Sequence, residues 1–111
     1  MLNLFKSVFK NDTYENLDAR EFLAKANTDP QAVLLDVRTP AEHEAGNIPG
    51  SINIDFFSPT FEKRVAMLDK EKHYFVFCRS GQRSGQACQL MHRLDFKNLY
   101  NLAGGVMTLQ R

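Results

Sequence analysis

Two short, continuous apolar runs constrain the fold of this sequence most. Residues 32–37 form a run that ends at Asp36 and Arg38, and residues 74–77 form a second run that leads into Cys78. Runs of this kind are typical of strands that are covered on both faces, as in the parallel sheets of α/β proteins. Helical patterns stand before, between and after the two runs. The sequence therefore predicts an α/β fold with an open, mostly parallel central sheet and helices on both faces.

Helix signals and strand signals alternate along the chain. Capping patterns mark two helix starts, which are Asp18 with Glu21 three positions later, and Thr39 before Pro40 with Glu42 three positions after Thr39. Helices are expected at residues 18–27 and 39–46, and two more are expected to begin at Ser58 and near Ser84. Additional short strands are expected at residues 51–54 and 99–102. In such a sheet, functional residues are expected beyond the carboxyl ends of the strands, where Asp36 and Cys78 stand.

The length of 111 residues suits one domain, which is expected to span residues 14–111. Residues 1–13 differ from the rest as an N-terminal extension. Leu2, Phe5 and Phe9 fall at helical spacing there, which predicts a short helix docked on the domain. A partner-binding or membrane-surface helix is the alternative for this extension.

The charge balance excludes several classes of partner. Lys and Arg number 14 and Asp and Glu number 13, for a net charge of +1, which argues against nucleic acid and against an acidic membrane surface. The sequence has neither a membrane-spanning apolar run nor a secretory leader, so a cytoplasmic protein is expected. Two cysteines with nine residues between them are too few for a disulfide scaffold and match no zinc-ligand spacing.

The segment after the second apolar run carries the chemistry. Cys78 is followed by four short or polar residues, Arg79, Ser80, Gly81 and Gln82, and by Arg83, and a helix then begins near Ser84. A tight turn here would direct backbone N–H groups at the sulfur, and Arg79 and Arg83 would add positive charge, so a thiolate is favoured. The alternative is a small buried core cysteine, but a glycine-containing loop with two arginines before a helix favours a reactive one. The sequence contains neither the phosphate-binding motif G-x-x-x-x-G-K-[ST] nor the dinucleotide-binding motif G-x-G-x-x-G.

Three separated segments resemble the single-domain rhodaneses, a family of sulfurtransferases, from about Tyr14 onward. The first is LLDVR at residues 34–38 with GNIPGSINI at residues 46–54, the second is CRSGQRS at residues 78–84, and the third is NLAGGV at residues 101–106. Their order and spacing also match the family. The resemblance implies the rhodanese-like version of the predicted α/β fold.

The resemblance also implies the activity, which is that of a thiosulfate sulfurtransferase. Cys78 would be the catalytic nucleophile and would carry a persulfide between two half-reactions, with Arg83 closing the loop. The implied substrate-binding residues are Arg79, Ser80, Gly81, Gln82, Arg83 and Ser84. Thiosulfate or a related small molecule would be the sulfur donor, and cyanide, a thiol or a protein would be the acceptor. No metal and no organic cofactor is needed.

Two other functions stay open at this point. A cysteine-dependent phosphatase or arsenate reductase can use the same fold, and rhodanese-like domains also serve as non-catalytic interaction modules. Only four residues separate Cys78 from Arg83, whereas the related phosphatases have five, so the smaller loop favours a single terminal sulfur over a phosphoryl group. The presence of Cys78, Gly81 and Arg83 together argues against a non-catalytic module.

Three positions depart from the family pattern. Asn47 stands where the family usually has histidine, His43 where it usually has an aromatic residue, and Leu109 where a tryptophan usually follows the paired glycines.

Other polar and sulfur-containing side chains receive simpler interpretations. Asp36 and Arg38 are expected to form a structural pair that supports the site, with substrate contact as the alternative. Cys88 is expected to pack on a helix face, although it could attack an oxidised Cys78. Surface positions or ordinary packing are expected for three histidines, namely His43, His73 and His92, and the core is expected to include Met91 and Met107.

Overall fold

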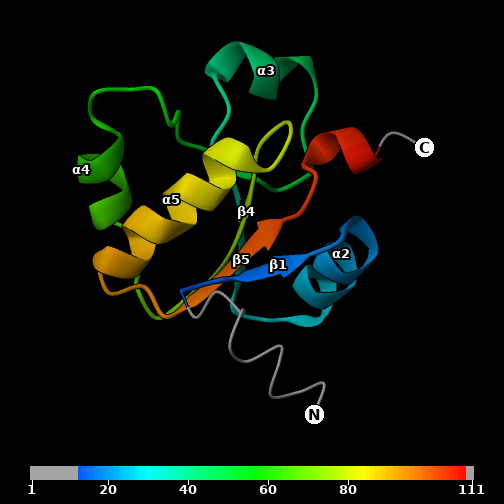
Figure 1. Ribbon diagram of the computed structural model, residues 1–111, viewed down its shortest axis with the longest axis horizontal. Coiled ribbons are helices and arrows are strands. Elements are labelled where there is room, and N and C mark those ends of the chain that lie inside the picture. Colours follow the sequence, from blue (N-terminus) through cyan, green and yellow to red (C-terminus); the bar gives the residue numbers. More distant parts are fainter. Residues whose placement is uncertain (1–12, 110–111) are drawn as a thin grey trace.

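The computed structural model describes residues 13–109, which form a five-stranded sheet flanked by helices (Figure 1). The strands are β1 (Glu15–Leu17), β2 (Ala32–Asp36), β3 (Ile52–Asn53), β4 (His73–Phe77) and β5 (Asn98–Leu102). The helices are α2 (Ala19–Thr28), α3 (Pro40–Ala45), α4 (Phe61–Ala66), α5 (Gln82–Arg93) and the short 3₁₀ helix η1 (Val106–Leu109). The strand order is β1-β5-β4-β2-β3, and every pairing between these strands is parallel. The predicted α/β fold is confirmed.

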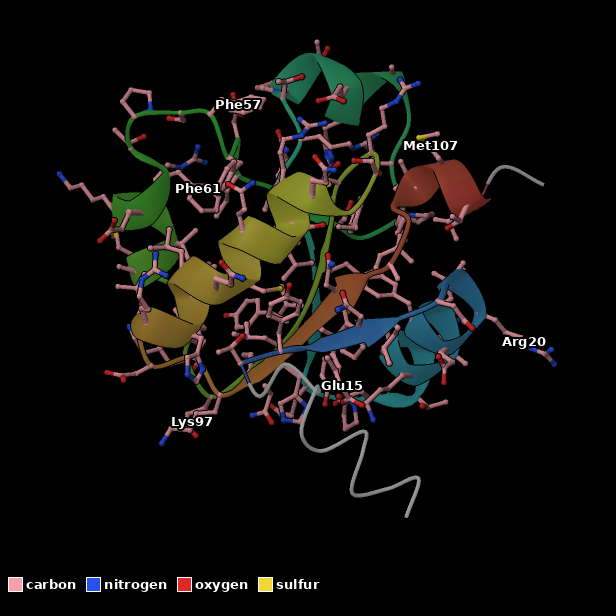
Figure 2. All side chains as sticks on the ribbon, in the orientation of Figure 1. Glu15, Arg20, Phe57, Phe61, Lys97 and Met107 are labelled. Atoms are coloured by element: carbon pink, nitrogen blue, oxygen red, sulfur yellow. The ribbon has the colours of Figure 1, made fainter. Side chains whose placement is uncertain are left out.

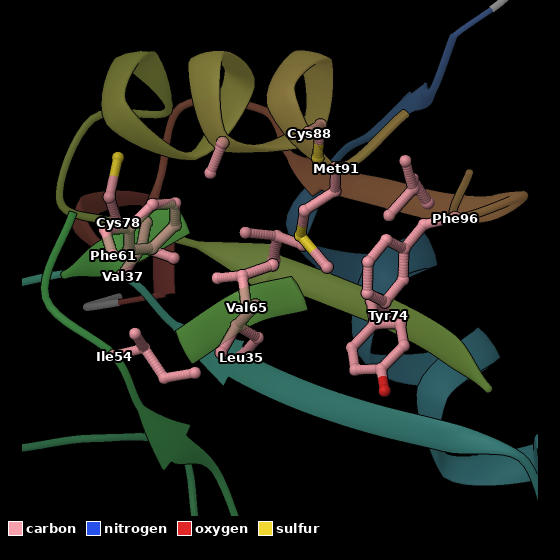
Figure 3. Packing of buried hydrophobic residues seen from close by; sticks show 13 residues of the cluster. Leu35, Val37, Ile54, Phe61, Val65, Tyr74, Cys78, Cys88, Met91 and Phe96 are labelled. Atoms are coloured by element: carbon pink, nitrogen blue, oxygen red, sulfur yellow. The ribbon is translucent and has the colours of Figure 1, made fainter. Parts of the chain in front are cut away.

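The central strand β4 contributes to the core on both faces of the sheet. Tyr74 and Val76 pack with α4 and α5, whereas Phe75 and Phe77 pack with α2 and η1. This alternation follows from the two-residue period of a strand, and it explains why residues 74–77 read as a continuous apolar run. Cys78, two positions after Val76, lies on the α5 side of the sheet (Figure 3).

The capping patterns form as predicted. The Asp18 side chain accepts a hydrogen bond from the Glu21 N–H at 2.9 Å. At the start of α3, Thr39 and Glu42 form a reciprocal capping box, and Gly46 follows the last helical residue. Each such cap satisfies backbone groups that the first helical turn leaves without partners.

The sequence patterns missed two elements and misplaced the start of others. β1 was not predicted, because it has three residues of which only Leu17 is buried, too few for a pattern. η1 is a single short turn that follows the paired glycines. α4 begins at Phe61 rather than at Ser58. α5 begins at Gln82 rather than near Ser84, because Gly81 has a φ of 97° and turns the chain directly into the helix.

Of the two methionines expected in the core, Met91 is fully buried but Met107 is 50% exposed. The prediction for Met107 is wrong because η1 is bound to its neighbours by backbone hydrogen bonds, which leaves this side chain outside. The expected N-terminal helix lies outside the described residues. Between residues 13 and 109, no helix is long and apolar enough to cross a membrane.

Candidate functional site

Cys78 lies at the carboxyl end of β4, in the middle of the sheet, and its residue surface is 0% exposed. Only Arg79, Ser80 and Gly81 separate it from the first residue of α5. The chain therefore turns sharply from a buried strand into a helix, with the N-terminus of that helix directed at the cysteine. Figure 3 shows the Cys78 side chain beneath the first turn of α5.

Three hydrogen bonds converge on the Cys78 sulfur. The Gly81 N–H donates at 3.1 Å, the Ser84 N–H at 3.4 Å and the Ser84 hydroxyl at 3.3 Å. The residue at the N-cap position, Gly81, has no side chain to accept from the first helical turn. The sulfur occupies that role instead, so the orphan N–H groups of α5 and its dipole both favour negative charge on sulfur.

These contacts make Cys78 a more acidic thiol than a free cysteine. Burial raises the pKa of Cys78, but the hydrogen bonds from Ser84 and Gly81, with a smaller contribution from the Ser80 backbone, outweigh burial, and the pKa lies below its ordinary value. The positive charge expected from Arg79 and Arg83 is therefore not the main cause. The main cause of the lowered pKa is the set of hydrogen-bond donors on the backbone and on the Ser84 side chain.

The acidity of Cys78 predicts a specific pH dependence. The thiolate is the reactive form, so the alkylation rate should rise with pH through the pKa of Cys78, with a midpoint below the value of about 8.5 that a free cysteine has. Ser84→Ala removes one donor and should move the midpoint upward. Alkylation by iodoacetamide between pH 5 and pH 10, followed by peptide mass spectrometry, measures both. A midpoint at or above the free value in the unmodified chain would show that this loop does not stabilise a thiolate.

The paired glycines after β5 support the loop from the other side. The Val106 N–H donates to the Cys78 carbonyl at 2.9 Å, and the Met107 N–H donates to the Arg79 carbonyl at 3.2 Å. Gly105 packs so closely on the loop that a Cβ atom there would overlap the carbonyl of Arg79. Because η1 binds these carbonyls, the peptide groups of the loop are fixed in orientation.

A second support comes from Asn101 on β5, a residue that the sequence patterns did not single out. Its buried side-chain amide donates to the Gly81 carbonyl at 3.3 Å and to the Asn16 side chain at 2.9 Å. The glycine at the turn is therefore held through β5 as well as through the helix. Asn101 is the first residue of the segment NLAGGV, but the sequence alone gave it no role in the loop.

Arg83 lies beside the loop and binds α3. Its guanidinium donates to both carboxylate oxygens of Glu42, at 2.8 and 3.1 Å, across 41 positions of the sequence. The hydrogen bond from Arg83 is the largest cause that lowers the pKa of Glu42, to about 2. Because Glu42 also caps α3, one carboxylate joins that helix to the N-terminus of α5. The sequence indicated only its capping role.

Asp36 and Arg38 form the predicted structural pair. The Arg38 side chain donates to both Asp36 carboxylate oxygens, at 2.9 and 2.8 Å, and to the Gly46 carbonyl at 2.6 Å. His43 is not a plain surface residue, because its Nδ1 lies 2.8 Å from Oδ2 of the buried Asp36. Asn47, the other departure in this region, donates to the His43 carbonyl at 2.7 Å and so caps the end of α3. These contacts attach α3 to the end of β2.

The remaining candidates have structural environments. Cys88 lies on α5, and its side chain is buried, which raises its pKa. Its Sγ lies 3.9 Å from the Tyr100 carbonyl oxygen, so the predicted packing role is confirmed. Leu109 is partly buried against the α2 side of the core. His73 contacts Asp29 at 2.7 Å, and His92 is exposed. In the described part of the chain, no three His, Cys, Asp or Glu side chains are placed to hold a metal ion.

The substrate-binding set predicted from the sequence thus surrounds the sulfur unevenly. Ser84 is buried and donates to the sulfur twice, and the Gly81 N–H donates once. The side chains of Arg79, Ser80 and Gln82 are exposed. The structure therefore combines a buried, acidic Cys78 thiol with hydrogen-bond donors from Gly81 and Ser84, and the other side chains of the loop face the surface.

Comparison with known proteins identifies the family. The family model of the rhodanese-like domain matches residues 18–111 of this chain. A sulfurtransferase of Allochromatium vinosum is 34% identical over 92 residues, which cover 82% of this chain and 84% of that protein. The tRNA uridine(34) hydroxylase of Sodalis glossinidius is 35% identical over 101 residues, which cover 86% of this chain but 28% of the hydroxylase. A rhodanese-related protein from Thermoplasma volcanium has a similar structure, with a TM-score of 0.74 and 26% identity over 87% of this chain and 92% of that one.

The chain therefore belongs to the rhodanese-like domain family. The three sequence segments that resemble this family come together in the fold, since residues 34–38, 78–84 and 101–106 all lie at the carboxyl ends of neighbouring strands.

Proposed function

We propose that this protein is a sulfurtransferase that holds sulfane sulfur as a persulfide on Cys78. One observation carries the proposal most directly, namely the convergence of Gly81 N–H, Ser84 N–H and the Ser84 hydroxyl on the Cys78 sulfur. These donors stabilise the thiolate before the reaction, and groups of the same kind stabilise an anionic persulfide after it. The similarity to the Allochromatium vinosum sulfurtransferase supports the same reaction class.

In the first half-reaction the donor is thiosulfate or a related anion. The Cys78 thiolate attacks the outer sulfur of thiosulfate, a new S–S bond forms, and the S–S bond of thiosulfate breaks. Sulfite leaves with the electron pair of that bond, and Cys78 keeps the transferred sulfur as a persulfide anion. One difficult transfer is thereby divided into two easier ones.

In the second half-reaction a nucleophile removes the outer sulfur. Cyanide attacks it and leaves as thiocyanate, or a thiol attacks it and leaves as a new persulfide, with its proton released to solvent. The electron pair of the broken S–S bond stays on Cys78, which returns as a thiolate. Arg83 and the backbone donors of residues 79–84 are proposed to bind the donor anion at the loop.

Phosphoryl transfer is disfavoured by the size of the loop. Only three residues lie between Cys78 and α5, and the Gly81 and Ser84 donors point at the cysteine sulfur itself. A phosphoryl group needs partners for three oxygens, and each buried oxygen left without a donor costs about 1–3 kcal/mol. The same argument applies to arsenate.

The test is steady-state kinetics with thiosulfate and cyanide, compared with hydrolysis of an aryl phosphate. The expected result is a set of parallel double-reciprocal lines for the sulfur reaction, as in a ping-pong mechanism, and no aryl phosphate hydrolysis that depends on Cys78. Efficient hydrolysis that is lost in Cys78→Ser, with no sulfur transfer, would show that this is a phosphatase.

The activity of the tRNA uridine(34) hydroxylase is not transferred to this chain, because the match covers only 28% of that enzyme. The proposed location is the cytoplasm, where a reducing environment keeps Cys78 and Cys88 as free thiols.

A further inference from the structure

Two large apolar side chains are exposed beside the Cys78 loop. Four such side chains are exposed in the described part of the chain, and they include Phe57 at 67% and Met107 at 50%. Figure 2 shows Phe57 and Met107 on either side of the N-terminus of α5, at the edge of the molecule where the loop lies. A single exposed apolar residue needs no explanation, so the placement of these two matters more than their number.

The Phe57 ring and the Met107 backbone are held by contacts with the site. The Phe57 ring lies 5.3 Å from the guanidinium carbon of Arg83, and its neighbour Phe56 packs edge-on against the buried Phe61 at 5.1 Å. Met107 is positioned by its own N–H, which donates to the Arg79 carbonyl. The structure therefore holds the Phe57 ring and the backbone that carries Met107 in place, which lowers the entropy cost of binding a partner there.

Among the described residues, one arginine beside the same loop has no ion-pair partner. Arg38 is paired with Asp36, and Arg83 is paired with Glu42. Arg79 is exposed, and its side chain makes no hydrogen bond or ion pair with the described residues. This guanidinium follows the proposed nucleophile directly, so a carboxylate brought to the loop would find an uncompensated positive charge.

Small substrates use only part of this surface. Thiosulfate and cyanide are charged and compact, and they have no apolar area to place against Phe57 or Met107. A protein segment with a cysteine can use all of it, because apolar side chains near the cysteine would contact Phe57 and Met107 while a carboxylate pairs with Arg79.

We propose that Phe57, Arg79 and Met107 form a docking rim for a protein acceptor, and that its occupant is an exposed segment carrying a cysteine with apolar and acidic neighbours. This inference rests on the proposed function. The acceptor thiolate attacks the outer sulfur of the Cys78 persulfide, the S–S bond to Cys78 breaks, and its electron pair stays on Cys78. The acceptor cysteine becomes the persulfide, and its thiol proton goes to solvent.

The experiment loads the full chain with thiosulfate and measures sulfur transfer to two cysteine peptides and to cyanide. The peptides share apolar residues around the cysteine and differ in one position, which is aspartate in one and asparagine in the other. The double variant Phe57→Ala/Met107→Ala is expected to lower kcat/KM for both peptides by roughly tenfold or more. Transfer to cyanide should stay within about twofold. Met67→Ala is the matched control, since Met67 is 81% exposed and lies at the end of α4.

Arg79→Gln isolates the charge. The unmodified chain should prefer the aspartate peptide, and Arg79→Gln should remove that preference, as the ratio of the two kcat/KM values reports. Equal losses for cyanide and peptides in the Phe57→Ala/Met107→Ala variant would contradict a docking rim. Peptide transfer that is unaffected by that variant, or no faster than transfer to dithiothreitol, would contradict a protein acceptor and indicate a low-mass thiol. Failure of the chain to form a persulfide at all would instead contradict the proposed function.

Discussion

Cys78→Ser is expected to abolish sulfur transfer from thiosulfate to cyanide, with a loss of at least about 10³-fold in kcat. A serine hydroxyl remains protonated at neutral pH and cannot keep a sulfur atom as a persulfide. The change is nearly isosteric, and a hydroxyl oxygen can accept from the same donors, Gly81 and Ser84. The fold should therefore be kept, as circular dichroism and denaturant unfolding would show.

Cys88→Ser is the matched control for this loss. Cys88 is buried, and its thiol contacts the Tyr100 carbonyl, so the variant should keep most of its activity at some cost in stability. If a folded Cys88→Ser variant loses activity as completely as Cys78→Ser, Cys88 is part of the reaction and its packing role is incomplete. Comparable activity in Cys78→Ser and in the unmodified protein would remove Cys78 as the nucleophile.

Gly105→Ala is expected to cause the second largest effect, a loss of about 100-fold in kcat/KM. The new methyl group would overlap the Arg79 carbonyl and crowd the Ser80 nitrogen, both of which are backbone atoms of the loop. Gly105 also has a φ of 70°, which is unfavourable for alanine. The loop must therefore move away from η1, and a displacement of about 1 Å at a reacting group can cost about 100-fold.

Two further glycine substitutions make a graded series with Gly105→Ala. At Gly104 the added methyl would meet a Thr108 methyl group at 2.6 Å, which is a side chain able to rotate, so a smaller loss is expected. At Gly46 nothing lies within 4 Å of the added Cβ, and near-normal activity is expected. Kinetic assays of folded protein measure the order. Full activity in Gly105→Ala would show that η1 does not fix the loop, and an equal loss in Gly46→Ala would show that the loss is not specific.

Much of the fold could be predicted because its signals are local. The β4 run, the caps at Asp18 and Thr39, and the turn at Gly81 each depend on neighbouring residues. β1 could not be predicted, because its three residues are stabilised by pairing with β5, which stands more than eighty positions later in the sequence.

In the candidate site, too, local features could be predicted and contacts between distant residues could not. The position of Cys78 at the end of a buried strand, before a glycine and a helix, was visible in the sequence. The second role of Glu42, which binds Arg83, was not, because the two residues are 41 positions apart and a capping box already accounts for a glutamate there. His43 was expected at the surface or in ordinary packing, and its contact with Asp36 was not predicted. Met107 was assigned to the core because apolar character alone does not distinguish a buried side chain from one on a rim.

Intact-protein mass spectrometry after incubation with thiosulfate tests the central claim most directly. The account predicts the gain of one sulfur atom on Cys78, located by peptide mapping, and its loss when cyanide is added. The gain should be absent in Cys78→Ser and present in Cys88→Ser. A protein that gains no sulfur, or that gains it on Cys88, would contradict the account.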